Sequence, residues 1–430
     1  MKKVLIITYY WPPAGGAGVQ RVLKFAKYLP QFGWTPIILT VENPDCPVID
    51  ETLLKDIHAE CKVYTTKAIE PFEIYKKLTG KDKNYKIPSD VITKSSNLSL
   101  TEKISKWIRI NLFIPDAKIG WKYFAVKEGM KIIRKEKVDL IFSTSPPHTV
   151  QLIAKKLAKF TKLKWVADFR DPWMEIVHYQ NLNRNFFTKL IDQNLEKNVL
   201  QNADSIITIS DDIVDLFKSK IGKKKYFVIP NGYDETDFLK SENTKNKIFT
   251  IAYTGVITKT RVPFVFLSVM KKFVNEDGIS NIKFIIAGKT CAEFINEVRK
   301  LNLENYVEEK GFLPHHESTN ILQNADVLFL IIDDVPNNKG FLTGKIFEYL
   351  GSKKPIYAVG PTNGNANEII QNTNSGKMVD YSDEEGAYQL LKIMYNNWQN
   401  NSFNYNFKVE EYSRKKLTEK LSNIFDEEIK

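Results

Sequence analysis

The sequence contains few cysteines, and they follow no recognised metal or disulfide pattern. Three of its 430 residues are cysteines, namely Cys46, Cys61 and Cys291, which are odd in number and far apart. Without C-x-x-C spacing or a cluster of histidine with cysteine, neither a disulfide framework nor a zinc site is indicated. The motifs D-x-D and H-E-x-x-H are also missing, so we expect no bound metal and a reducing compartment such as the cytoplasm.

Long hydrophobic runs are missing as well. The run VLFLII at residues 327–332 is far shorter than the roughly 20 residues that a membrane span needs. The apolar run behind Lys2 and Lys3 is only about five residues long and ends in aromatic residues, so no N-terminal signal sequence is expected. We therefore expect a cytoplasmic protein that does not cross a bilayer.

Acidic residues are fewer than basic residues. Lysine and arginine number 62 against 51 acidic residues, which gives a net charge of +11 and predicts a polyanionic partner such as a nucleic acid, an anionic membrane surface or a phosphorylated substrate. The segment TEKISKWIRINLFIP interleaves Lys103, Lys106 and Arg109 with apolar residues up to Phe113. Such a segment fits peripheral docking at the inner face of the cytoplasmic membrane. The alternative is a surface helix that covers its own domain.

Short apolar runs alternate with helical patterns along the whole chain, which is typical of parallel sheets wrapped by helices. The expected strands are residues 4–8, 36–41, 140–143, 165–168, 205–209 and 227–229, then 248–255, 282–288, 307–309, 327–332 and 355–360. A break after IPNGYDETDF separates the two series. We predict an α/β protein with two Rossmann-like domains, residues 1–232 and 245–400, facing each other across a cleft. We also expect a terminal helix at about 407–430 that docks on one of the two domains. We assign it to the first domain.

A glycine-rich turn follows the first strand. In YYWPPAGGAGVQRV, Gly16 and Gly18 fill the first two places of G-x-G-x-x-G, but the third place holds Arg21. Backbone N–H groups at the helix start would attract an anion. In a nicotinamide-dependent oxidoreductase, Glu42 would bind the ribose, but Arg21 in the third place disfavours that function.

The segment KGFLTGKIFEYLGSKKPI predicts a second anion site. Read as a helix from Thr343, it turns Ile346, Phe347 and Leu350 toward a core, while Lys345 and Glu348 share another face. There the lysine could meet a diphosphate and the carboxylate a ribose. The alternative is an exposed salt bridge of under about 1 kcal/mol.

Five motifs in order resemble those of the family 4 glycosyltransferases of the GT-B class, and within it a subgroup that builds bacterial surface polysaccharides. They are GG-x-G-x-x-R, VADFRDPW, VIPNGYD, AYTGVITKTR and GKIFEYLGSKKPI, and the resemblance runs from residue 3 to about 380. It implies retaining transfer of a sugar from a nucleotide diphosphate donor to a glycan or lipid-linked acceptor, without a catalytic metal or a cofactor.

The resemblance also implies site residues. Donor binding is assigned to Gly15, Gly16, Gly18, Gly255, Gly340 and Glu348, and neutralisation of the departing diphosphate to Arg261 and Lys345. Gly340 stands where many members carry the first glutamate of Glu-x7-Glu, and the backbone amides of residues 340–342 are a candidate replacement.

Acceptor contacts are expected from two other motifs. Asp168 or Asp171 in VADFRDPW would orient or deprotonate the acceptor hydroxyl, with Arg170 beside them, unless Asp168 caps a turn and Arg170 pairs with Asp171. His148 in STSPPHTV is a further acceptor candidate, with a structural role at a helix start as the alternative.

Three other functions are weighed against transfer. A nucleotide-sugar epimerase could use the same two-domain frame, and a nicotinamide-dependent oxidoreductase the glycine turn. Nucleic-acid binding would explain the net positive charge, but the sequence contains no recognised nucleic-acid-binding module. We therefore expect no nucleic acid as a partner.

Overall fold

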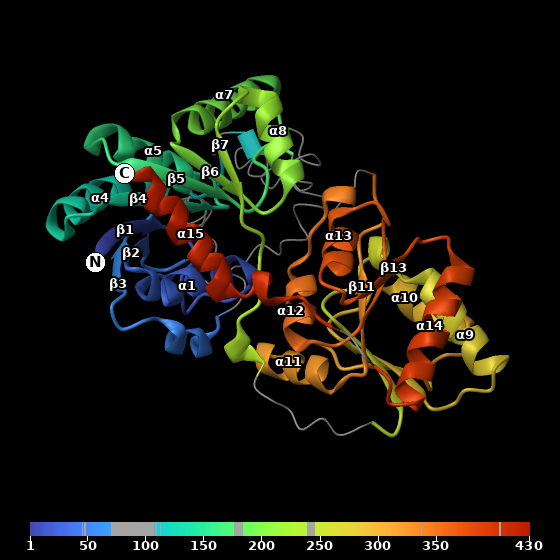
Figure 1. Ribbon diagram of the computed structural model, residues 1–430. Coiled ribbons are helices and arrows are strands. Elements are labelled where there is room, and N and C mark those ends of the chain that lie inside the picture. The colour runs from blue at the N-terminus through green and yellow to red at the C-terminus, as the bar shows by residue number, and fades with distance from the viewer. Residues whose placement is uncertain are drawn as a thin grey trace, which may run out of the picture. The chain divides into compact units, whose positions relative to one another are not determined.

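The computed structural model describes residues 1–44, 46, 49–69, 107, 110–111, 113–175, 184–238, 246–336, 338–403 and 406–430. Most of the segment TEKISKWIRINLFIP, including Lys103, Lys106 and Arg109, lies outside the described residues. The chain forms two compact units, Met1–Pro230 with Thr418–Lys430, and Asn231–Leu417 (Figure 1). The cleft predicted between two domains stays a prediction.

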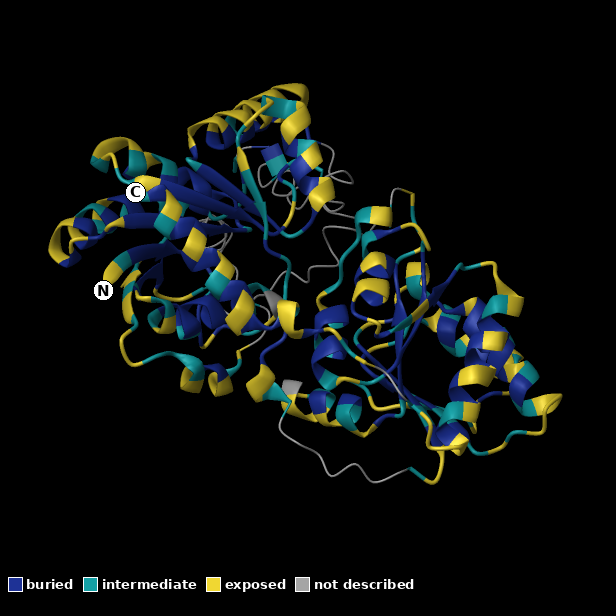
Figure 2. Cartoon of the chain, in the orientation of Figure 1, coloured by how far each residue is buried: buried dark blue, intermediate teal, exposed yellow. Residues whose placement is uncertain are grey.

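Unit 1 contains a sheet of seven parallel strands. Their order is β3-β2-β1-β4-β5-β6-β7. The strands are β1 (Lys2–Ile7), β2 (Trp34–Val41), β3 (Lys62–Thr66), β4 (Leu140–Ser145), β5 (Lys164–Phe169), β6 (Ser205–Thr208) and β7 (Lys225–Val228). The central strands are buried along most of their length, as expected of strands covered on both faces (Figure 2).

Helices cover the sheet of unit 1. They are α1 (Ala17–Tyr28), α4 (Lys122–Glu136), α5 (Thr149–Thr161), α7 (Phe186–Asn202) and α8 (Asp211–Ile221). Helix α4 packs on α5, α5 on α7 and α7 on α8, so these four form one layer. The last helix, α15 (Arg414–Glu428), begins in unit 2 and continues into unit 1, where the ring of Phe425 lies 5.2 Å from that of Trp34 and 5.4 Å from that of Phe142.

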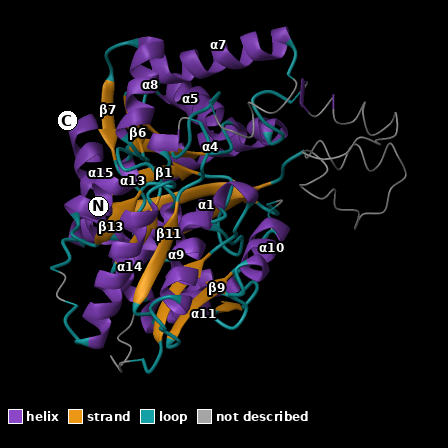
Figure 3. Ribbon diagram, turned by 90° about the vertical axis from the view of Figure 1, so that its right-hand side faces the viewer, coloured by secondary structure: helices purple, strands orange, loops and turns teal. Residues whose placement is uncertain are grey.

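Unit 2 repeats the architecture with a sheet of six parallel strands in the order β10-β9-β8-β11-β12-β13. They are β8 (Phe249–Thr254), β9 (Ile282–Ala287), β10 (Val307–Glu309), β11 (Val327–Ile331), β12 (Ile356–Val359) and β13 (Gly376–Val379). Helices α9 (Phe264–Asn275), α10 (Ala292–Lys300), α11 (His315–Asn324), α12 (Gly344–Ser352), α13 (Asn365–Asn372) and α14 (Glu384–Gln399) connect or flank them (Figure 3).

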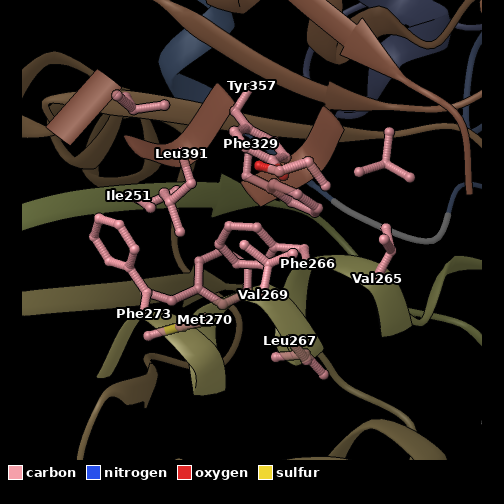
Figure 4. Packing of buried hydrophobic residues seen from close by; sticks show 14 of the residues in the cluster. Ile251, Val265, Phe266, Leu267, Val269, Met270, Phe273, Phe329, Tyr357 and Leu391 are labelled. Atoms are coloured by element: carbon pink, nitrogen blue, oxygen red, sulfur yellow. The ribbon is translucent and has the colours of Figure 1, made fainter. Parts of the chain in front are cut away.

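The core of unit 2 is rich in aromatic side chains. Phe266 of α9 lies over the sheet with its ring 4.5 Å from that of Phe329 and 5.3 Å from that of Tyr357 (Figure 4). Edge-to-face and tilted ring contacts of this kind add to the free energy gained from burial. The prediction of an α/β protein with two Rossmann-like domains is confirmed.

Candidate functional site

Each sheet has one point at which the strand order reverses. The reversal lies between β1 and β4 in unit 1 and between β8 and β11 in unit 2. Loops that leave two such strands diverge, and parallel α/β sheets bind ligands at the carboxyl ends of these strands. We call residues 8–18 with 145–149 the first switch point, and residues 255–263 with 332–345 the second. The sequence motifs gather at these two places.

Lys345 occupies the second switch point. Gly255, directly after β8, has φ +126°, which favours glycine, and a Cβ there would lie 2.2 Å from Cε of Lys345, so a larger residue would displace the lysine. Burial and, to a smaller extent, the positive charge of Arg261 lower the pKa of Lys345 to about 8, although the negative charges of Glu348 and Asp333 oppose both effects. A poorly hydrated ammonium group next to a second cation would gain from a bound anion.

Asp333 fixes Arg261 at the same place. The Nε and Nη2 groups of Arg261 donate to Oδ2 of Asp333 at 2.8 and 2.5 Å, and the hydroxyl of Thr260 donates to Oδ1 at 2.6 Å. The loop after β11 is held in turn, because the hydroxyl of Tyr381 donates to the carbonyl of Asp333 at 3.1 Å. Arg261 thus has a defined position beside Lys345.

The start of α12 supplies further hydrogen-bond donors. The hydroxyls of Thr343, the N-cap residue, and Thr254 are buried without a hydrogen-bond partner among the described residues. The first amides of a helix also lack partners within the helix, and α12 has no acidic residue in its first turn. The two hydroxyls, the first amides of α12 and the ammonium group of Lys345 are therefore candidates for an anion site. Glu348, partly exposed, lies one turn further along α12, and Gly340 ends the short helix η7 (Asn338–Gly340).

The glycines of the first switch point precede α1. Gly16 is its N-cap with φ +97° and is exposed, while Gly15 and Gly18 are partly exposed. Helix α1 has no acidic residue in its first turn, so its N-terminus can also attract an anion. The turn therefore fits the predicted contact with a phosphate or a sugar, which stays a prediction.

Asp168 is held inside unit 1 and does not reach the surface. It is 0% exposed, and its carboxylate accepts from Arg21 at 2.7 and 3.1 Å and from the hydroxyl of Thr144 at 2.6 Å. Arg21, 1% exposed, also donates to the carbonyl of Pro230 at 2.9 Å. Both carboxylate oxygens of Asp168 therefore already accept hydrogen bonds, which makes it the less accessible of the two candidates for the acceptor hydroxyl. These contacts also explain the arginine in the third glycine place.

Arg170 connects three loops. Its guanidinium donates to the carbonyl of Ser145 at 3.0 Å, to that of Pro146 at 2.7 Å and to that of Gly18. The side chain is 8% exposed. We expected Arg170 to contact the acceptor, but the structure directs its donors to the backbone, so it positions the first switch point.

His148 is enclosed in the same region. It is 0% exposed, and its ring stacks on that of Trp173 at 4.5 Å, with neither nitrogen bonded to any described residue. Burial, together with the charges of Arg170 and Arg184, lowers the pKa of His148 to about 3, so the ring is neutral at physiological pH. The expected direct contact with an acceptor is not what this buried arrangement provides.

Asp171 differs from these neighbours because it is exposed. It follows β5 by two residues and so lies at the carboxyl edge of the sheet. Of the two carboxylates in VADFRDPW, it is the one that solvent reaches.

Three of these residues were not predicted as site residues, namely Thr254, Thr343 and Arg21. A threonine directly before a strand-end glycine and one at a helix N-cap are both weak signals. In the described part of the chain, no group of three or more histidine, cysteine, aspartate or glutamate side chains could hold a metal ion. Among the same residues, no helix is long and apolar enough to cross a membrane.

Comparisons with known proteins agree with this geometry. Residues 87–237 match the family model described as Glycosyltransferase Family 4. Among solved structures, sucrose-phosphate synthase from Thermosynechococcus elongatus is 14% identical, with a TM-score of 0.58 and coverage of 100% of this chain and 96% of that one. No curated protein sequence matches the chain.

Two further solved structures share the fold. Anabaena HepE in complex with UDP-glucose has a TM-score of 0.55, 13% identity and coverage of 99% and 95%. A putative UDP-N-acetylglucosamine 2-epimerase from Listeria monocytogenes also has a TM-score of 0.55, with 11% identity and coverage of 99% and 98%. At these identities the structures establish the fold. The structures show the GT-B fold, and the family model over residues 87–237 agrees with the predicted resemblance to the family 4 glycosyltransferases.

Proposed function

We propose that the protein transfers a sugar, with retention of configuration, from a nucleotide diphosphate donor to a hydroxyl of a glycan or lipid-linked acceptor in surface polysaccharide synthesis. The anion site at the start of α12 carries this proposal. Lys345, Arg261, the hydroxyls of Thr254 and Thr343 and the helix amides offer several donors to one diphosphate. HepE was solved with UDP-glucose, which supports the kind of donor.

Charge on the leaving group is what this site would stabilise. When the bond between the sugar and the diphosphate breaks, negative charge develops on the terminal phosphate. Preorganised cations and amides then lower the barrier without a metal ion, so we propose that neither a metal nor a cofactor takes part. Glu348 would accept hydrogen bonds from the ribose, and the amides of residues 340–342 would contact the sugar.

Asp171 is our candidate for the acceptor side. Its exposed carboxylate could accept the proton of the attacking hydroxyl or orient that hydroxyl, whereas Asp168 would act through Arg21 and the backbone as a positioning residue. The glycines of the first switch point would lie against the donor phosphates or the sugar.

Two variants test the proposal. Lys345→Gln should weaken binding of the nucleotide sugar and slow its hydrolysis, because the ammonium group meets the diphosphate before and during bond breaking. Asp171→Asn should leave donor binding unchanged and slow transfer to an acceptor extract about 10²-fold or more. Lys271→Gln, an exposed lysine on α9, is the matched control. Unchanged donor binding in Lys345→Gln would contradict the proposal, and added EDTA should have no effect.

An epimerase remains the second candidate, because the Listeria structure shares the fold. The two functions differ in their products. An epimerase converts the donor in the absence of an acceptor, whereas a transferase leaves its configuration unchanged. NMR of a nucleotide sugar incubated with the protein alone would separate them. The sequence also predicts a peripheral membrane location from residues 103–113. Most of these residues lie outside the part of the chain that the structure describes, so this location stays a prediction.

A further inference from the structure

Helix α7 carries an unusual group of exposed apolar side chains. Phe186 and Phe187 are each 73% exposed, Leu190 is 45% exposed and Ile191 49%. We call these four residues the apolar patch. Every other labelled α-helix of the described chain carries at most one large apolar side chain with such exposure. Figure 2 shows the outer side of α7 largely exposed. Single exposed apolar residues are common, but a contiguous group indicates an interaction surface.

Lysines lie on the same layer of helices, beside the C-terminal part of α7. Helix α5, which packs against α7, has Lys155, Lys156 and Lys159 and no acidic residue. A hollow of about 520 Å³ between α5 and the end of α7 is lined by Lys155, Lys159, Lys162, Lys164, Asn198, Asn202 and Asp204, together with apolar atoms. Lys164 pairs with Asp204 at 2.8 Å, and Lys155 bonds to Asn198. The layer is therefore strongly basic.

The acidic residues of α7 do not neutralise these lysines. Asp192 and Glu196 are buried on the inner side of the helix, where Asp192 accepts from Trp173 and Glu196 from Lys220. The lysines also crowd one another, because burial and the charges of Lys122 and Lys159 lower the pKa of Lys155. Such a cluster gains free energy when negative charge approaches.

We propose that the outer face of α5 and α7 docks on an anionic lipid bilayer. The apolar patch enters the headgroup region, and Lys155, Lys156 and Lys159 meet the anionic headgroups. A bilayer interface offers acidic headgroups beside hydrocarbon, which matches lysines beside phenylalanines. A nucleic acid would match the charge alone and leave the four apolar side chains in water. The segment around Trp107 adjoins the start of α7, because Asn111 accepts from the amide of Asn185 at 2.8 Å and from the hydroxyl of Thr188 at 3.0 Å.

The position of the patch has a consequence for the substrate. Helix α7 follows β5 in the chain, so the patch at its start belongs to the carboxyl edge of the sheet, where Asp171 lies. Docking through the patch would bring this edge near the membrane, whereas the lysines of α5 would meet headgroups further from it. If the proposed function holds, on which this step rests, the acceptor is the lipid-linked one of the two classes.

Flotation of the full chain with vesicles tests the docking without any substrate. The vesicles contain phosphatidylcholine with about a third phosphatidylglycerol, or phosphatidylcholine alone. The protein should float with the anionic vesicles and be released at raised salt. The double variant Phe186→Ser/Phe187→Ser should bind at least tenfold more weakly, and Lys156→Glu/Lys159→Glu at least about fivefold more weakly per lysine. Ile393→Ser/Lys271→Glu, on exposed sites of α14 and α9, is the matched control and should bind like the unchanged protein.

Three outcomes would overturn the proposal. They are no flotation of the unchanged protein, equal binding of all variants, and a dimer in sedimentation velocity that the phenylalanine variant converts to a monomer while no vesicle binding occurs. The last result would assign the patch to a second copy of the chain. A thermal shift with UDP-glucose, unchanged in every variant, verifies folding. It also separates a failure of docking from a failure of the proposed donor site.

Discussion

The lowered pKa of Lys345 predicts that donor affinity falls with rising pH. With a pKa of about 8, the lysine is about nine-tenths protonated at pH 7 and about one-tenth protonated at pH 9. If the diphosphate binds the ammonium form, the affinity should drop about tenfold over this range, or about 1.4 kcal/mol. Bound diphosphate raises the pKa of Lys345, so binding near pH 8 should take up a proton.

Stability should change in the opposite direction. The pKa of Lys345 in the folded protein lies below its ordinary value of 10.5, so the unfolded state binds more protons between these two pH values. The free energy of unfolding should therefore rise with pH between about 8 and 10.5, by at most about 3 kcal/mol, since the side chain keeps some contact with water. Between about pH 8 and 9, donor affinity should therefore fall while the free energy of unfolding rises.

Isothermal titration calorimetry with the nucleotide sugar that gives the largest thermal shift measures the effect. Two buffers with different ionisation enthalpies report the proton uptake. Lys345→Arg keeps its charge up to pH 9 and should show a flat profile, whereas Lys345→Gln should bind weakly at every pH. A tenfold fall that persists unchanged in Lys345→Gln would refute the argument, because another group would then be the one that titrates.

Other predictions concern stability and packing. Asp168→Asn leaves Arg21 buried without its counter-charge and should cost about 3–5 kcal/mol in urea unfolding, and a loss below about 1 kcal/mol would contradict the ion pair. Gly255→Ala should lower both stability and donor binding, because its Cβ would lie 2.2 Å from Cε of Lys345. Gly278→Ala, at φ +68° with no atom within 4 Å, should show the backbone strain alone. Leu421→Ala should cost about 2–5 kcal/mol, since this residue of α15 is 0% exposed.

Much of the fold follows from apolar runs. Strand β11, VLFLI, is buried at every residue, and the predicted run at 327–332 locates it to within one residue. Strands β3 and β13 were missed, because KVYTT is mostly exposed and GKMV is only four residues long at the edge of its sheet. The predicted face of α12 is confirmed, since Ile346, Phe347 and Leu350 are at most 1% exposed.

The site was harder to predict from the sequence than the fold. Gly255 and Lys345 are 90 positions apart, and the approach of one to the other depends on β8 and β11 being neighbours, which no local pattern encodes. A carboxylate at a strand end was interpreted as reactive, but a partner 147 residues earlier in the chain neutralises Asp168. The acceptors of Arg170 are likewise distant in the sequence, because they are backbone carbonyls of two other segments, residues 145–146 and Gly18.

The two switch points share a topology but not a charge balance, and this difference argues for their division of labour. At the first, Asp168 neutralises Arg21, Arg170 donates to backbone carbonyls, and Asp171 is the exposed carboxylate. At the second, Asp333 pairs with Arg261, while Lys345 keeps a charge that burial disfavours. A dianionic diphosphate therefore gains more at the second switch point, whereas a neutral hydroxyl is compatible with the first. We infer that the repeated fold can serve two chemically different substrates, because its charged side chains are balanced differently in each unit.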